Sequence, residues 1–175
     1  MFKKKIILFL IISFFCTSAY SAGTSKKTTE VGKGGREDLS HMNVTNSDYR
    51  KGLNALKQAK KYEKKKKVDK AVKRFNDAAK FFALANEQYP SEPDILNYLG
   101  FSLRKAGDFA MAEIYYEQGL DIDPEHKGIN EYLGKLYIQT NRIDKAKERL
   151  EVLKNCNCNE FQELRAAIEQ RSSKY

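Results

Sequence analysis

Two prolines, Pro90 and Pro124, lie 34 residues apart and enclose two amphipathic patterns. Apolar or small residues recur three and four positions apart, first over residues 96–103 and then over residues 109–120, which places each set on one face of a helix. Gly107 and Asp108 separate the two patterns, so the stretch predicts two helices joined by a tight turn. The faces consist of Leu96, Leu99, Gly100 and Leu103, and of Phe109, Ala112, Tyr115, Tyr116, Gly119 and Leu120.

The same pattern begins again after Pro124, at an offset of 34 residues. Gly100 recurs as Gly134, and Ala112 recurs as Ala146. A helix–turn–helix unit with this period resembles the tetratricopeptide repeat (TPR) family. The resemblance implies an all-α protein, an α-solenoid of three TPR helix–turn–helix repeats with a C-terminal capping helix. It also implies a module that binds other proteins and is not an enzyme.

The first repeat is irregular. Counting back 34 residues from the second repeat puts Lys65 and Lys66 at the places of Leu99 and Gly100, which would bury two unpaired charges. A further shift of seven residues puts Ala59 at the place of Gly100 and Tyr62 at the place of Leu103. An alanine–aromatic–alanine triplet then occurs twice, seven residues apart, and seven residues rotate a helix by almost two whole turns. We therefore expect an extended second helix in this repeat, over about residues 69–88. The triplets are Ala71, Phe75 and Ala78, and Ala78, Phe82 and Ala85.

The sequence before the repeats has the features of a leader and a linker. Lys3–Lys5, the apolar run Ile6–Phe15 and small residues near Ala19–Ala22 are typical of a cleaved signal peptide over residues 1–22. Such a leader implies export to the periplasm or the medium of a bacterium. The apolar run is about half of the ~20 residues that a membrane-spanning helix needs, and Phe14 and Phe15 before Cys16 disfavour lipid attachment. Residues 23–46 contain few apolar side chains and predict a disordered linker.

The repeat domain is expected over residues 47–171. Its repeats span about residues 47–92, 93–126 and 127–158, and the capping helix spans about residues 160–171. Ser47 and Ser91 are the expected N-caps of the first helices of repeats one and two, with Pro93 in the first turn of the latter.

No catalytic, cofactor or metal site is predicted. The two histidines, His41 and His126, have no partners at catalytic or metal-ligand spacing. Cys156 and Cys158 lack the two-residue spacing of redox dithiols and the four ligands that zinc requires. We expect a structural pair in the turn before the capping helix, and its oxidation state stays open.

The TPR resemblance implies a peptide-binding groove lined by the first helix of each repeat. In this groove Phe101 is the expected apolar anchor, exposed and flanked by Arg104 and Lys105; the alternative is that Phe101 packs on the neighbouring repeat. Relatives that clamp a C-terminal carboxylate use a lysine and an asparagine in repeat one, where this chain has Leu56 and Lys60. The expected groove residues are Leu56, Lys60, Lys64, Asn97, Phe101, Arg104, Lys105, Glu131, Lys135 and Ile138.

Charge is unevenly distributed. Residues 50–80 contain 13 Lys and Arg against 3 Asp and Glu, in a chain whose formal net charge is +9. This bias predicts a second surface, for an anionic membrane or cell-wall polymer. A solvated lysine-rich face is the alternative, and nucleic acid is not an expected partner. The oligomeric state is left open. The expected patch consists of Lys61, Lys65, Lys66, Lys67, Lys70, Lys73 and Arg74.

Overall fold

The structure is a computed structural model that describes residues 47–172. The expected signal peptide and linker lie outside these residues. The described chain consists of α-helices joined by short turns, as the repeat pattern predicts. The helices are α1 (Ser47–Lys64), α2 (Val68–Gln88), α3 (Pro93–Ala106), α4 (Phe109–Ile122), α5 (Lys127–Gln139), α6 (Ile143–Val152) and α7 (Asn159–Ser172).

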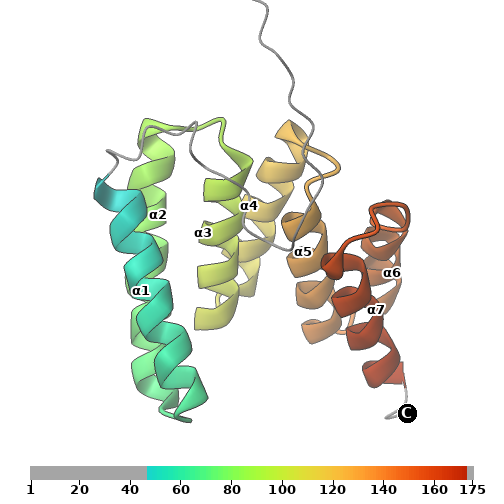
Figure 1. Cartoon of the computed structure of the whole chain (residues 1–175), viewed down its shortest axis with the longest axis horizontal. Coiled ribbons are helices and arrows are strands. Elements are labelled where there is room, and N and C mark those ends of the chain that lie inside the picture. Colours follow the sequence, from blue (N-terminus) through green and yellow to red (C-terminus); the bar gives the residue numbers. More distant parts are fainter. Residues whose placement is uncertain (1–46, 173–175) are drawn as a thin grey trace, which may run out of the picture. The chain divides into compact units, whose positions relative to one another are not determined.

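The helices form three consecutive antiparallel pairs followed by a capping helix (Figure 1). α1 packs on α2, α3 on α4, and α5 on α6, while α7 packs against both α5 and α6. The first helices of successive pairs also meet, because Tyr49 of α1 contacts Tyr98 of α3 and α3 contacts α5. The capping helix α7 continues this row by packing on α5. We call α1, α3, α5 and α7 the inner layer. This solenoid with its terminal cap confirms the fold expected from the sequence.

The first pair is longer than the other two. α2 has 21 residues and α4 has 14, so the expected extension of the second helix is present. α1, with 18 residues, is also longer than α3, with 14. The sequence analysis missed the residue that this extension requires, Gly52, where a Cβ would lie 2.8 Å from the Phe82 ring. Glycine therefore permits the close approach of the extended parts of α1 and α2.

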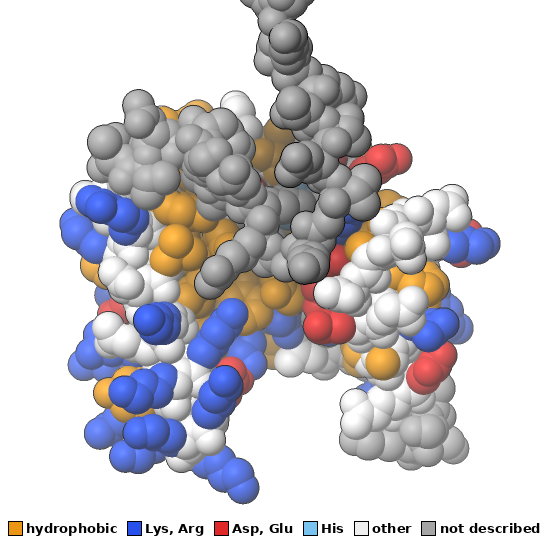
Figure 2. Space-filling view, viewed as in Figure 1, with side chains coloured by type: hydrophobic (Ala, Val, Ile, Leu, Met, Phe, Trp, Pro, Cys, Tyr) orange, Lys and Arg blue, Asp and Glu red, His pale blue; other side chains and the backbone are white. Residues whose placement is uncertain are grey.

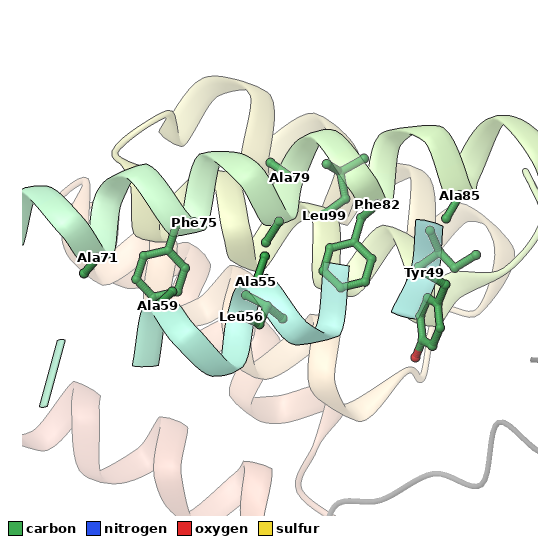
Figure 3. Close-up of a cluster of buried hydrophobic side chains, with 12 residues drawn as sticks. Tyr49, Ala55, Leu56, Ala59, Ala71, Phe75, Ala79, Phe82, Ala85 and Leu99 are labelled. Carbon is green, nitrogen blue, oxygen red and sulfur yellow. The ribbon is translucent and has the colours of Figure 1, made fainter. Parts of the chain in front are cut away.

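A core of alanine and aromatic side chains joins the first pair to α3. Figure 3 shows Phe75 and Phe82 pointing from α2 toward α1, at the two expected positions of the triplets. Phe82 is fully buried, and its ring stacks on Tyr98 of α3 with 5.2 Å between ring centroids. The Tyr49 ring meets Phe82 edge-on at 5.7 Å. Burial of these rings is the main stabilising contribution in this part of the fold.

Turn residues end and begin the helices at defined positions. Gly107 caps α3 with φ of 99°, a left-handed conformation that favours glycine. Asp108 then caps α4, because its carboxylate accepts a hydrogen bond from the Met111 backbone N–H at 3.1 Å. His126 caps α5 in the same way through Nδ1 and the Ile129 N–H at 3.1 Å. The expectation for Ser91 is wrong, because Glu92 occupies the N-cap of α3 without a side-chain capping bond, and Pro93 follows at the first helical position.

The two cysteines are joined by a disulfide in the turn between α6 and α7. Both side chains are partly buried against the core of the last repeat. Asn157 between them has φ of 46°. Because the two cysteines are only two residues apart, the bond does not tie one helix to another.

Replacing Cys156 and Cys158 together with serine should change the free energy of unfolding by less than about 2 kcal/mol, because the loop that the disulfide closes is very short. Thermal unfolding followed by circular dichroism measures this. Leu164→Ala is the control, since Leu164 is fully buried and its truncation should cost about 2–5 kcal/mol. A loss in the double serine variant as large as that of the control would show that the disulfide secures the cap.

Residues 47–172 include no helix that is both long enough and apolar enough to span a membrane.

Candidate functional site

One pocket on the inner layer lies between α1 and α3. Its volume is about 600 Å³. Leu53, Leu56 and Tyr98 supply its apolar side chains, and lysines of α1 and the following turn supply the rest. We call it the lysine groove, lined by Leu53, Leu56, Lys57, Lys60, Lys61, Lys64, Lys65 and Tyr98.

The lysines of this groove are exposed, and none of them forms an ion pair with another described residue. Figure 2 shows blue side chains gathered on the left of the view, where Figure 1 places α1. Lys105 of α3, by contrast, pairs with Glu63. The lysine groove therefore combines an apolar surface with positive charge that no described carboxylate neutralises.

Phe101 is not the exposed anchor that the sequence analysis expected. Its ring is half-buried, 4.9 Å from the Tyr132 ring of α5 and 6.1 Å from the Phe75 ring of α2. The Lys60 ammonium lies 5.4 Å from its ring centroid. The alternative reading, packing on the neighbouring repeat, is the one observed. Phe101 joins adjacent repeats and contributes only part of its ring to the surface.

A second pocket of about 320 Å³ lies between α3, α5 and α7. Arg104, Lys135 and Ile138, three of the expected groove residues, line it, so the structure brings them together. We call it the arginine pocket; its lining is completed by Gln139, Ala167, Gln170 and Arg171.

A buried carboxylate lies beside this pocket. Lys135 forms ion pairs with Glu131 and with Glu163 of α7, the latter at 2.7 Å. Burial raises the pKa of Glu131 to about 7, although hydrogen bonding to Lys135 opposes the shift. The hydrogen bond from Lys135 lowers the pKa of the more exposed Glu163. Burial disfavours the charge on Lys135, but its hydrogen bonds with both carboxylates raise its pKa.

The pKa of Glu131 predicts a pH-dependent stability. The unfolded chain releases this proton near 4.5 and the folded chain near 7, so between these values the folded state binds more protons and the free energy of unfolding falls as pH rises. Glu131→Gln should remove this fall, which is on the order of 2 kcal/mol. Urea unfolding of both proteins at about pH 5 and pH 8 tests the effect, with the exposed Glu148→Gln as control. An equal loss between the two pH values in wild type and Glu131→Gln would contradict it.

The remaining expected groove residues lie outside the arginine pocket. Leu56 and Asn97 are 4% and 8% exposed, so they are buried and offer a bound segment little surface to contact. Lys60 and Lys64 line the lysine groove, whereas Lys105 is occupied by its pair with Glu63.

The residues of the expected anionic-surface patch also lie in different surroundings. Lys61 and Lys65 belong to the lysine groove itself. Arg74 is bound to Asp77 at 3.0 Å. The remaining members are exposed lysines near the turn between α1 and α2: Lys66, Lys67, Lys70 and Lys73.

Sequence reasoning missed several lining residues. Leu53 lies three positions before Leu56 and one turn of helix away, so extending the helical pattern toward the N-terminus would have found it. Gln139 and Arg171 had no such signal, because they reach the arginine pocket from the ends of α5 and α7.

Within the described residues, no group of three or more His, Cys, Asp or Glu side chains is arranged to hold a metal ion. His126 is a helix cap, and its Nε2 lies 3.2 Å from a carboxylate oxygen of Asp94. The geometry is that of a binding surface with apolar and cationic side chains.

Comparisons with known proteins agree with the repeat pattern. Residues 103–168 match the family model described as tetratricopeptide repeat. No curated protein sequence matches the chain.

Several solved structures have a similar fold. The TPR2B-domain:pHsp70-complex of yeast Sti1 is 17% identical with a TM-score of 0.50, and the match covers 72% of this chain and 99% of that one. The Yersinia enterocolitica type III secretion chaperone SycD, in complex with a peptide of the translocator YopD, is 17% identical with a TM-score of 0.51, covering 70% and 92%. The same chaperone in an alternative dimer is 18% identical with a TM-score of 0.52, covering 71% and 94%. Residues 103–168 are thus a tetratricopeptide-repeat segment, and the described helices have the fold of that family.

Proposed function

We propose that this chain is a non-catalytic scaffold or adaptor that binds a segment of another protein against its inner layer. The observation that carries the proposal is the lysine groove, where Leu53, Leu56 and Tyr98 lie among lysines without ion-pair partners in the described chain. Such a surface suits a segment that combines apolar and acidic side chains, because the lysines complement its charge and the groove buries its apolar groups.

Two structures with a similar fold support this mode of binding. The chaperone SycD is in complex with a peptide of the translocator YopD, and the yeast Sti1 domain is in complex with pHsp70. The lysine-rich start and apolar run of residues 1–22 favour export, so the proposed partner is an envelope protein.

A second candidate is association with an anionic membrane or cell-wall polymer. Lys66, Lys67, Lys70 and Lys73 are exposed and form no ion pair within residues 47–172. They favour a general attraction to polyanions, which should weaken strongly as ionic strength rises.

Two double charge reversals separate the candidates. A peptide selected from a random library for binding to residues 47–175 is the probe. Lys60→Glu with Lys64→Glu, in the groove, should weaken binding of this peptide by at least about tenfold at ~0.15 M salt. Lys70→Glu with Lys73→Glu changes the charge of the same helix pair equally but lies outside the groove, and should weaken binding by less than about threefold. Isothermal titration calorimetry measures both affinities.

Wild type and the two double variants are then added to vesicles containing anionic lipid at low and moderate salt. Equal losses in both double variants, together with vesicle binding that disappears as salt rises, would favour the polyanion candidate over the groove. If the library yields no binding peptide, the proposed peptide-binding function is contradicted. Phe101→Ala is unsuitable as the deciding variant, because Phe101 also packs on Tyr132.

A further inference from the structure

The disulfide between Cys156 and Cys158 contributes little to the stability of the fold. Both cysteines lie in one turn, and the ring that the bond closes includes only Asn157 between them. A disulfide stabilises a protein mainly by restricting the unfolded chain, and this gain falls as the closed loop becomes shorter. The bond also joins no two helices. Stabilisation of the fold therefore gives little reason for this pairing.

Other contacts hold the turn when the bond is open. The Cys156 backbone N–H donates to the Leu153 carbonyl oxygen at 3.1 Å. Leu153 before the turn and Leu164 of α7 are 1% and 0% exposed, and both belong to the core of the last repeat. None of these contacts depends on the bond between the two sulfur atoms. The disulfide can therefore be reduced and formed again while α6 and α7 stay packed.

The small ring makes the disulfide easy to reduce. One residue separates the two cysteines, whereas common redox dithiols have two residues between them and close a larger ring. In the closed ring Asn157 has a left-handed backbone with φ of 46°, which is unfavourable for residues other than glycine, although least so for asparagine. Disulfides that are strained or exposed are more oxidising than structural ones. We therefore expect the dithiol to be favoured more than in a wider ring.

The disulfide is accessible and its neighbours in the sequence are mostly uncharged. Cys156 and Cys158 are both partly exposed, and the asparagines before, between and after them are exposed. Lys154 is paired with Glu151 at 2.9 Å. Glu160 is the one acidic residue within two sequence positions of either cysteine. A thiolate of another protein can therefore approach the bond with little repulsion.

The two cysteines differ in their position relative to α7. Cys158 immediately precedes Asn159, the first residue of α7, whereas Cys156 lies farther back in the turn. The N–H groups and the dipole of a helix N-terminus stabilise a thiolate there, although Glu160 in the first turn partly offsets this effect. The sulfur whose thiolate is more stable is the better leaving group. An attacking thiolate should therefore bond to Cys156 and displace Cys158.

We propose that the disulfide between Cys156 and Cys158 is an exchange site that oxidises a dithiol of another exported protein. One thiolate of the partner attacks Cys156 Sγ, the bond between Cys156 and Cys158 breaks, and Cys158 leaves as a thiolate. The second thiolate of the partner then attacks the partner sulfur of this mixed disulfide and displaces Cys156.

The exchange is balanced without a further reactant. Two electrons pass from the partner dithiol to Cys156 and Cys158, the partner gains one disulfide, and the two protons that it loses are taken up by the two cysteines through water. Each chain oxidises one partner, so the reaction is stoichiometric and not catalytic. It goes beyond the proposed binding of a segment on the inner layer and does not depend on it.

The first test measures how easily the disulfide is reduced. It uses the full chain with Cys16→Ser, so that Cys156 and Cys158 are its only cysteines. The protein is equilibrated with mixtures of reduced and oxidised glutathione, and its free thiols are alkylated and counted by mass spectrometry. In the control, one glycine inserted after Asn157 widens the ring. The equilibrium constant for reduction should be at least about threefold larger without the insertion, and an equal or smaller constant would overturn the proposal.

The second test separates exchange from a structural role. Reduction by dithiothreitol should leave the circular dichroism spectrum unchanged and lower the melting temperature by less than about 6 °C. Leu164→Ala in the oxidised protein is the control and should lower it more, because Leu164 is fully buried. A fall on reduction as large as that of the control would show that the disulfide secures the cap, and the proposal would be wrong.

The third test follows the reaction itself, in the absence of oxygen. The probe is a reduced synthetic peptide with two cysteines separated by two residues. The oxidised chain should form one peptide disulfide per chain and gain two thiols, at a rate at least about tenfold above that of oxidised glutathione at the same concentration. The double variant Cys156→Ser with Cys158→Ser should be inactive. A rate no higher than that of oxidised glutathione would count against an exchange site.

The fourth test identifies the sulfur that is attacked. Oxidised protein is mixed briefly with the monothiol cysteamine and then alkylated with a maleimide. Trypsin cleaves after Lys154 and Arg165, so both cysteines lie in one fragment whose modifications are located by mass spectrometry. Most molecules should have cysteamine on Cys156 and the maleimide on Cys158, and the opposite distribution would overturn the proposed attack. Because no test uses the library-selected peptide, failure here leaves the proposed segment binding untouched.

Discussion

Replacing Phe82 with alanine is expected to lower the free energy of unfolding by about 3–5 kcal/mol. The Phe82 ring is fully buried between Gly52, Tyr98 and Tyr49. Its removal leaves a cavity that these rigid neighbours cannot fill, and the loss is a large part of the ~5–15 kcal/mol that stabilises a typical domain.

Phe81→Ala is the matched control for this prediction. Phe81 is the adjacent residue of α2, but it is only partly buried, and the Lys51 ammonium lies 5.6 Å from its ring centroid. Its truncation should cost about 1 kcal/mol or less. Urea unfolding followed by circular dichroism compares the two variants. An equal loss in the free energy of unfolding for the two variants would mean that the extended parts of α1 and α2 are not packed around Phe82.

The second large effect is expected at Gly100, where α3 packs directly on Tyr116 of α4. A Cβ built at Gly100 would lie 2.6 Å from Cε1 and 2.7 Å from Cδ1 of Tyr116, a ring that is fully buried. Gly100→Leu should therefore force the two helices apart and cost about 3 kcal/mol, the upper part of the range for overpacked cores. Gly100→Ala should already be destabilising, despite the higher helix propensity of alanine.

Gly134→Ala tests whether the rigidity of the neighbour decides this cost. Gly134 occupies the same repeat position in α5, but its Cβ would meet the terminal methyl groups of Leu164 at 2.6 and 2.7 Å. A leucine can change rotamer at its end more easily than a buried ring can move, and alanine gains up to about 1 kcal/mol in helix propensity. We expect a smaller loss for Gly134→Ala than for Gly100→Ala in thermal unfolding. The reverse order would be evidence against the packing described for α3 and α4.

The order of the helices in residues 47–172 could be predicted from the sequence, because each copy of the repeated sequence pattern forms the same pair of helices. Gly100 and Gly134 share a position, and each lies against a large side chain that follows in the chain, Tyr116 or Leu164. The spacing of apolar residues also indicated the long α2, since the triplets around Phe75 and Phe82 lie on one face. These features depend on contacts within a repeat or with the repeat or capping helix that follows it.

The binding residues were less predictable, because exposure depends on which neighbouring helix covers a side chain. Helical spacing places Phe101 on the inner face of α3, but Tyr132, 31 positions later, covers part of its ring. Lys105 shares that helix, yet Glu63 occupies its charge from α1. No local pattern encodes either contact.

The sequence by itself determined the repeat period, the order of the helices and the excess of lysine in the first pair. The tertiary structure decided which of those charges remain unpaired. Among residues 47–172 it left the lysines of the lysine groove without carboxylate partners, whereas it paired Lys105 with Glu63 and Arg142 with Glu113. It also buried Arg104 beside a pocket completed by α7. The physical reason is that periodicity specifies the face of a helix, whereas burial and ion pairing are set by side chains that distant segments bring to that face.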